Sequence, residues 1–383
     1  MNFVISDELA SVGETARRFA TERVAPGYAR REQDACLDAE LTREMGRLGL
    51  IAPELPEDLG GAGLPGVASG IVMEAIAAAD LNVAYAQLLG SLCGKIIAGN
   101  ADTDLAREWV GRICRGESLV ALGLTEPHAG SDASQARVTA EADGNHYVIS
   151  GEKTSISACT QADAIVLFAR TGAPGSGAGG MTALLVPLDD PNVRKTVFHD
   201  VGSGAVGRGS LFFDGVRVPA DYRLGPEGQG FKEVMQGFDY SRALIGLQVV
   251  GPARASLDET WAYTAERQAF GQPLARHQGV SFELADAEAR LEAARLLCYK
   301  TLSLRDAGLP HTQEAAMAKY LAPKTAFEVI HQCLLTHGHA GYSDDYPHQQ
   351  RLRDVMGLEI GDGTAQIMKL IIARQKLPRG VAP

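Results

Sequence analysis

The first part of the chain places apolar residues at the spacing of an α-helix. Leu9, Val12, Ala16 and Phe19 recur every three or four positions before Pro26. A second apolar helix is predicted from about 67 to 79, after a loop at 56–63 in which three glycines occupy four positions. We expect residues 1–118 to form an N-terminal helical domain.

The middle of the chain changes to short runs of β-branched and apolar residues. These runs lie at 147–151, 164–169, 183–187 and 211–213, separated by Gly, Pro, Asn and Asp. No helical pattern lies between them, which favours antiparallel pairing over a βαβ sheet. We expect a central antiparallel β-barrel or sandwich over residues 119–226.

The last part of the chain returns to a helical period. One apolar seam has a spacing of three and four and ends before Gly308 and Pro310; its members are Leu284, Ala287, Leu291, Ala294, Cys298 and Leu302. Further helices fit 312–337 and 350–376. Residues 227–383 are therefore expected to form a four-helix bundle, and the whole chain an α+β protein of three segments.

Charge and cysteine content narrow the class of protein. The 383 residues include 36 Lys and Arg against 47 Asp and Glu, a net charge of −11, which argues against a general nucleic-acid binder but leaves room for one anionic ligand held by a few cations. The six cysteines form no C-x-x-C pair and indicate reduced thiols in the cytoplasm. No signal peptide or apolar run long enough to span a membrane is visible, so we expect no membrane insertion.

Two local patterns suggest cofactor or metal sites but are better explained by loops. Residues 175–180 fit G-x-G-x-x-G, yet a strand-like run follows instead of the helix that a dinucleotide loop requires. His337 and His339 have no carboxylate or cysteine at matching spacing. We expect no metal.

Four other segments carry candidate chemistry, each with a plain structural alternative. Residues 122–132 offer backbone N–H groups and hydroxyls suited to a ring edge or phosphate, or form a capped turn. Residues 267–278 place an Arg before a Phe, an anion-plus-ring pattern or a helix end capped by Gly271.

The other two segments contain acidic residues. Asp362, between two glycines, is a candidate base if burial raises its pKa, or else it or Thr364 caps the next helix. Asp239 and Arg242 share a helix face, where an ordinary surface ion pair is the simpler interpretation.

Taken together and in this order, these segments resemble the acyl-CoA dehydrogenase family over nearly the whole chain. Residues 125–132 match its Thr-Glu-Pro-x-Ala-Gly-Ser-Asp signature, with His128 for the usual Gly. Arg267, Phe270, Gly271 and His277-Gln278 match its FAD segment, and residues 362–367 match its catalytic-base segment.

The resemblance implies a fold, a cofactor and roles for individual residues. FAD would lie between the β domain and the C-terminal bundle. Its flavin and linker would contact residues of the first loop and of the strand that follows, with Ser157 near flavin N5 and Ser155 where the family has a Trp: Leu122, Leu124, Thr125, Gly130, Ser131, Ser155 and Ser157. The ADP part would contact Leu335, Gly338, His339, Thr364 and Gln366.

The same resemblance implies partners and a reaction. Arg267, Phe270 and Gln278 would reach the FAD of a neighbouring subunit, which implies an oligomer, typically a homotetramer. Asp362 would remove the α-proton of an acyl-CoA while the β-hydrogen leaves as hydride, and the electrons would pass to an electron-transfer flavoprotein or similar acceptor. The substrate side would include Ser131, Asp239, Arg242, Gly361 and Gly363.

Departures from the family pattern point to the substrate. The base is Asp362 instead of Glu, Ser241 occupies the alternative base position, and Gly361 replaces a Tyr. A short base beside an opened pocket suits a substrate that is branched or cyclic at the α-carbon, and the pattern resembles cyclohexane-carboxyl-CoA and cyclohexene-carboxyl-CoA dehydrogenases. The alternatives are a nitroalkane-oxidase-like flavoenzyme, a dehydrogenase of carrier-protein thioesters, and a catalytically silent flavin-binding paralogue.

Overall fold

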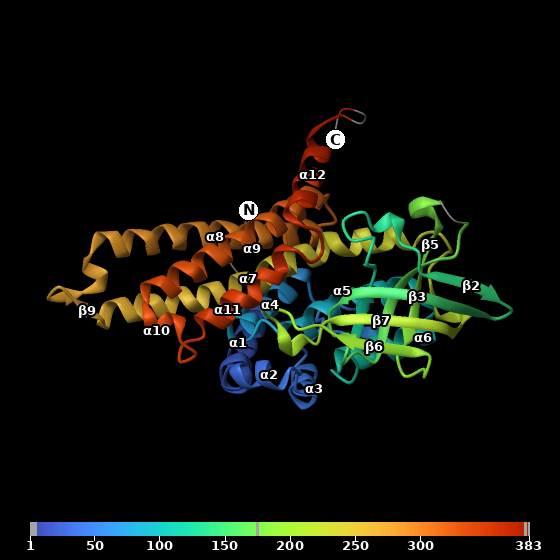
Figure 1. The fold of residues 1–383 in the computed structure, drawn as a ribbon, viewed down its shortest axis with the longest axis horizontal. Helices are drawn as coiled ribbons and strands as arrows, with labels where there is room; N and C mark the ends of the chain where they lie inside the picture. The colour runs from blue at the N-terminus through green and yellow to red at the C-terminus, as the bar shows by residue number, and fades with distance from the viewer. Residues whose placement is uncertain (1–5, 174–175, 379–380, 382–383) are drawn as a thin grey trace.

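A computed structural model describes residues 6–173, 176–378 and 381. The chain forms a helical N-terminal segment, a β segment and a C-terminal bundle, with the sheet at one end and the long helices reaching to the other (Figure 1). Within the described residues, no helix is both long and apolar enough to cross a membrane.

The N-terminal segment is helical, as its apolar period predicts. α1 continues directly into a π-helical turn at Ala20–Val24, and both α4 and α5 are apolar around most of their circumference, which fits their burial between other elements. The helices are α1 (Asp7–Phe19), α2 (Tyr28–Asp34), α3 (Ala39–Arg47), α4 (Gly66–Ala79), α5 (Ala84–Asn100) and α6 (Thr103–Cys114).

The β segment is one sheet with the order β6-β7-β3-β2-β4-β5-β8, with β1 paired to β4. Most pairs are antiparallel as predicted, but β1 and β2 each pair with β4 in parallel. The strands are β1 (Val120–Gly123), β2 (Thr139–Asp143), β3 (His146–Ile156), β4 (Ala164–Arg170), β5 (Met181–Pro187), β6 (Val193–Val197), β7 (Gly209–Pro219) and β8 (Arg223–Leu224).

The glycine-rich stretch around residue 177 does not open a helix of the kind that binds dinucleotides. Gly177–Gly180 form a short 3-10 turn, and β5 follows it at once. The first glycine of the pattern, at position 175, lies outside the described residues. The described part of the pattern therefore agrees with the loop interpretation.

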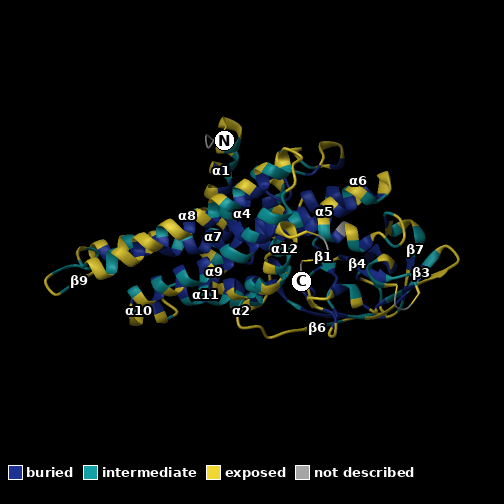
Figure 2. Cartoon of the chain, turned by 90° about the horizontal axis from the view of Figure 1, so that it is seen from above, coloured by how far each residue is buried: buried dark blue, intermediate teal, exposed yellow. Residues whose placement is uncertain are grey.

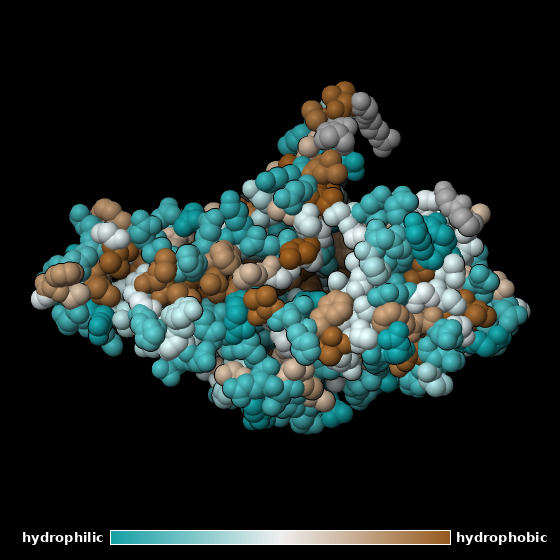
Figure 3. Space-filling model, in the orientation of Figure 1, coloured by the Kyte–Doolittle hydropathy of each residue, from teal (hydrophilic) through white to brown (hydrophobic). Residues whose placement is uncertain are grey.

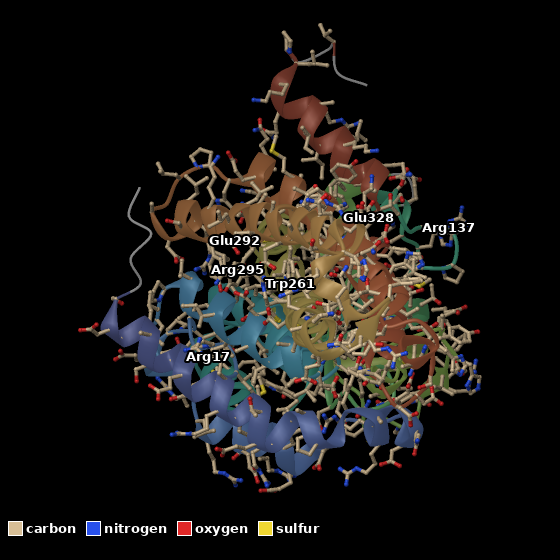
Figure 4. The ribbon with its side chains drawn as sticks, turned by 90° about the vertical axis from the view of Figure 1, so that its left-hand side faces the viewer. Arg17, Arg137, Trp261, Glu292, Arg295 and Glu328 are labelled. Carbon is tan, nitrogen blue, oxygen red and sulfur yellow. The ribbon has the colours of Figure 1, made fainter. Side chains whose placement is uncertain are left out.

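The C-terminal segment is built on three long helices, α7 (Gly230–Glu266), α8 (Gln278–Asp306) and α9 (Thr312–Thr336). All six predicted seam residues of α8 are fully buried. The short strands β9 (Gln268–Ala269) and β10 (Gln272–Pro273) form a hairpin between α7 and α8. Seen along the long helices, the N-terminal helices lie below the bundle, and Glu292 and Arg295 mark α8 (Figure 4).

The predicted helix 350–376 is two helices. α11 (His348–Met356) ends in a 3-10 turn at Gly357–Glu359, and α12 (Ala365–Lys376) begins after a loop. The short helix α10 (His339–Tyr342) lies before this region. The break falls at Gly361-Asp362-Gly363, where Asp362 and Gly363 have φ values of 54° and 104° that no α-helix accommodates. Both α11 and α12 pack against α9.

The apolar core is continuous from the N-terminal helices into the bundle, as the dark band of buried residues in Figure 2 shows. A second cluster fills one face of the sheet. Five of the six cysteines are buried, Cys36 is exposed, and all are free thiols.

Candidate active site

The loop between α11 and α12 presents Asp362 to the first third of α7. Its carboxylate Oδ2 accepts a hydrogen bond of 2.9 Å from Ser241 Oγ. The neighbouring Thr364 is the N-cap of α12, and its hydroxyl accepts from the Ile367 N–H at 3.4 Å. The sequence allowed either Asp362 or Thr364 to cap the helix. Thr364 is the residue that caps α12, and the Asp362 side chain faces α7 instead.

The surroundings of Asp362 favour a carboxylate that can accept a proton. Burial raises the pKa of the Asp362 carboxyl, while the Ser241 hydrogen bond and the charges of Lys319 and Arg242 oppose that rise. On the α5 side, burial raises the pKa of Tyr85, and the charge of Asp362 raises it further. A carboxylate with a raised pKa is a stronger base than an exposed Asp.

Asp239 and Arg242 form a buried ion pair, not the surface pair that the sequence favours. Arg242 Nη1 lies 2.9 Å from Asp239 Oδ1, and the two side chains are only 5% and 19% exposed. Asp239 Oδ2 also accepts from Thr312 Oγ1 at 2.6 Å, and Arg242 Nε donates to the Asp362 carbonyl at 3.5 Å. The pair thus connects α7, α9 and the Asp362 loop.

Lys319 is a charged residue at this site that the sequence analysis misses. It lies on α9, and its Nζ donates to the Gly363 carbonyl at 3.0 Å. The sequence does contain one indication of this site. A lysine stands among the alanines of a helix face predicted to be buried, where a charged side chain is unusual unless it has a partner. The alanines on this stretch of α9 are all buried: Ala315, Ala316, Ala318 and Ala322.

A cleft of about 340 Å³ lies beside Asp239 and Arg242. In the space-filling view the surface is hollowed beneath α12, at the junction of the bundle and the β segment (Figure 3). The lining of the cleft comes from the start of α7, the start of α9 and the side of α12: Lys232, Met235, Gln236, Asp239, Arg242, Thr312, Ile371, Arg374 and Gln375. Its mixture of cations, amides and apolar groups suits an extended, partly anionic ligand.

The signature loop after β1 is fixed to β3. The Thr154 N–H donates to the Thr125 carbonyl at 2.9 Å, and Glu126 closes a tight turn with Ala129. Lys153, which is fully buried, donates to Glu126 at 2.8 Å and to the Leu124 carbonyl at 3.0 Å. The loop is therefore held by a buried ion pair, and the capped-turn interpretation is too simple.

The hydroxyls that this loop and the end of β3 display are free. Within the described residues, Thr125, Ser131, Ser155 and Ser157 make no side-chain hydrogen bond, and a Cβ added at Gly130 would meet open space. Leu122 and Leu124 lie at the base of the same loop, half-buried and buried respectively. Unpaired hydroxyls beside open backbone fit the polar edge and linker of FAD.

The other predicted cofactor residues lie elsewhere. Phe270, at the tip of the β9–β10 hairpin, is 98% exposed, and Arg267 and Gln278 beside it are exposed too. Leu335, Gly338 and His339 form an exposed stretch before and within α10. Figure 1 places the hairpin at the end of the bundle away from the sheet, so the chain does not bring it to the Asp362 loop.

His337 does not share the exposure of its neighbours. It is buried and stacks on Tyr263 with ring centroids 4.1 Å apart, and it lies 4.4 Å from the ring of buried His348. Its Nδ1 contacts the Cys333 carbonyl at 2.9 Å. The residue therefore packs at the end of α9, where it closes the core beneath the α10 loop.

Known proteins of one family are similar to this chain along almost its whole length. Family models described as the N-terminal, middle and C-terminal domains of acyl-CoA dehydrogenase match residues 6–117, 121–216 and 228–377. The bovine mitochondrial short-chain specific acyl-CoA dehydrogenase is 36% identical over 94% of this chain and 88% of its own length. The cyclohexane-1-carbonyl-CoA dehydrogenase of Geobacter metallireducens is 33% identical over 98% of this chain and 99% of its own.

A solved structure supports the same conclusion. The butyryl-CoA dehydrogenase of Megasphaera elsdenii superposes with a TM-score of 0.95 at 30% identity, covering 99% of this chain and 100% of that one. The fold and the site define an FAD-dependent oxidoreductase. The chain belongs to the acyl-CoA dehydrogenase family, and its reaction is the FAD-dependent dehydrogenation of an acyl-CoA.

Proposed function

We propose that the enzyme desaturates an acyl-CoA that is cyclic or branched at its α-carbon, with Asp362 as the base. The observation that carries this proposal is the space beside that base. A Cβ built on Gly361 would meet only the Gly357 carbonyl oxygen, at 3.7 Å, and Gly361 itself is exposed. A substrate ring or branch can occupy the volume that a large side chain at this position would fill.

The protein residues divide the work of proton removal. Asp362 takes the α-proton, and Ser241 orients its carboxylate through the 2.9 Å hydrogen bond. FAD, held by the loop around Thr125 and Ser131 and by the end of β3, would supply the acceptor for the β-hydrogen as hydride. Asp239 and Arg242 line the cleft by which the CoA part would enter. Ser131 and Gly363 are the further substrate contacts that we propose.

The remaining assignments rest on loops, helix starts and a hairpin that the fold leaves accessible. The free hydroxyls around Thr125 and Ser155 would contact the flavin and its linker, and Thr364 and Gln366 at the start of α12 would reach the ADP part together with the α10 loop. Phe270 projects away from its own chain, which supports a contact with the FAD of a second subunit. We infer a homotetramer that passes electrons to an electron-transfer flavoprotein or a similar acceptor.

A panel of CoA esters tests the substrate class. Flavin bleaching is measured with cyclohexane-carboxyl-CoA, an α-branched acyl-CoA, butyryl-CoA and octanoyl-CoA, with product identification. We expect the cyclic and branched esters to be preferred. In Gly361→Phe, that preference should fall by about 10- to 200-fold, the range for one mismatched group in a pocket. A clear wild-type preference for octanoyl-CoA would refute the proposal.

Four measurements separate the proposed function from its rivals. Asp362→Asn should keep FAD and lose bleaching, because an amide accepts no proton at neutral pH; normal bleaching in this variant would place the base elsewhere. Peroxide production with nitroalkanes, without bleaching by any CoA ester, would favour an oxidase. Activity confined to carrier-protein thioesters would identify the carrier-linked alternative, and protein that cannot be reconstituted with FAD would identify a silent paralogue.

A further inference from the structure

A buried lysine that proton removal does not use lies against the loop of the base. Lys319 is 1% exposed, although Lys is almost never fully buried without a partner. Its ammonium makes one hydrogen bond within the described residues, the 3.0 Å bond to the Gly363 carbonyl. That carbonyl belongs to the residue directly after Asp362, so the lysine holds the backbone that carries the base.

The loop needs such a restraint because its backbone conformation is unfavourable. Asp362 has a φ of 54°, in the left-handed region that residues with a Cβ rarely adopt. Two cations from two helices hold its carbonyl groups. Arg242 of α7 donates to the Asp362 carbonyl at 3.5 Å, and Lys319 of α9 donates to that of Gly363.

The charges around the lysine couple it to the base. Burial lowers the pKa of Lys319 to about 8, Asp362 and Glu359 act to raise it, and Arg242 acts to lower it. The ammonium is therefore still mostly protonated at neutral pH. In return its charge acts to lower the pKa of Asp362 against the effect of burial.

We propose that Lys319 is a positioning residue for Asp362: it fixes the 361–363 loop through the Gly363 carbonyl, and its charge keeps the neighbouring carboxylate ionised. The lysine touches neither substrate nor cofactor in this role. The inference rests on the proposed function of Asp362 as the base. It means that α9, through Lys319, helps to orient that base.

The test compares variants of the FAD-loaded enzyme with the wild type. Lys319→Met should lower kcat by about 100-fold, the loss that a displacement of about 1 Å produces, with KM little changed. The acid limb of its kcat–pH profile should move to higher pH, because the charge that opposes protonation of Asp362 is gone. Lys319→Arg, which keeps charge and donor, should recover part of the rate and restore the acid limb.

Matched variants exclude a general effect. Lys324→Met removes an exposed lysine from the same helix and should leave both kcat and the pH profile unchanged. If Lys319→Met does not fold, Lys319→Gln serves instead, since it keeps a donor but not the charge, and its acid limb should shift in the same way. A folded, FAD-loaded Met or Gln variant with the kcat and acid limb of the wild type would overturn the proposal.

Failure of the two proposals is distinguishable. If no CoA ester bleaches the flavin of the wild-type enzyme, the proposed function is refuted, and the role of Lys319 is refuted with it. If CoA esters bleach the flavin of the wild type and of the Lys319 variants equally fast, only the role of Lys319 is refuted. A crystal structure of the Met variant gives a readout independent of activity, because the 361–363 loop should be displaced from α9.

Discussion

At the scale of single residues, the pKa of the Asp362 carboxyl results from opposing effects. Burial raises the pKa of Asp362, and a hydroxyl and two cations limit the rise. The same opposing effects act on Glu126 with the opposite outcome: burial acts to raise its pKa, but Lys153 and two backbone N–H groups lower the pKa below its usual value. In both places the loop backbone is fixed by the same groups that set the charge.

Ser241→Ala tests the balance at Asp362. The Ser241 hydrogen bond opposes the rise that burial causes, so its loss should raise the pKa of Asp362 further. The base must be ionised to act, so the acid limb of flavin reduction should move to higher pH. Ser303→Ala, at an exposed position of α8, should leave the limb in place. An unmoved limb in Ser241→Ala would contradict this account.

The sequence could suggest Asp362 but not its surroundings. Asp362 stands between two glycines, and this local pattern marks a sharp turn. The burial of Asp239 and Arg242 depends on α9 and α12, which lie far along the chain, so spacing alone favours a surface pair. Lys319 was missed for the same reason: its partner, the Gly363 carbonyl, is 44 positions away.

At the scale of elements, periodicity predicts the long helices and the main strands well. The α8 seam is buried at every predicted position. In a long helix the apolar period repeats over many turns, so one irregular position does not obscure the pattern. Short elements are harder to predict. The parallel pairs of β4 depend on chain direction, and the break between α11 and α12 depends on two backbone dihedral angles.

The β9–β10 hairpin carries a prediction about the assembly. Phe270 has a φ of 51° and Gly271 one of 79°, the two-residue geometry that normally selects Asn-Gly. Phe270→Ser should leave the fold intact, since the ring is almost fully exposed, but lower FAD content and oligomer mass. The flavin-to-protein absorbance ratio and light scattering measure both. Leu309→Ser, at another exposed apolar position, is the control; unchanged values for Phe270→Ser would exclude the subunit contact.

At the scale of the whole molecule, one buried carboxylate joins all three segments. Asp354 of α11 accepts from Tyr28 Oη at 2.8 Å and from Asn82 Nδ2 at 3.1 Å. It also accepts from the Ser203 N–H of the β segment at 2.6 Å. Burial raises its pKa to about 7, and the charges of Asp80 and Glu32 add to the rise.

This raised pKa predicts how stability depends on pH. Unfolded Asp titrates at about 3.9, so between about pH 4 and 7 the folded state holds a proton that the unfolded state has lost. The free energy of unfolding should therefore fall as pH rises through this window. Asp354→Asn, neutral at every pH, should flatten that dependence in thermal melts. Asp286→Asn, at an exposed site, should retain it, and a retained slope in Asp354→Asn would refute the assignment.

The β9–β10 hairpin and the Asp362 loop lie apart along the bundle (Figure 1), and in the proposed assembly only the hairpin contributes to the site of a second subunit. Ser241, Arg242 and Lys319 of the same chain hold the Asp362 loop. Phe270 is 98% exposed, and its aromatic contact within the described part of the chain is with the edge of the His277 ring. In an assembly that shares FAD across subunits, dilution would remove the cofactor while leaving the base in place. Occupancy by FAD would then report the concentration of the enzyme itself, and a dilute preparation could be inactive yet fully folded.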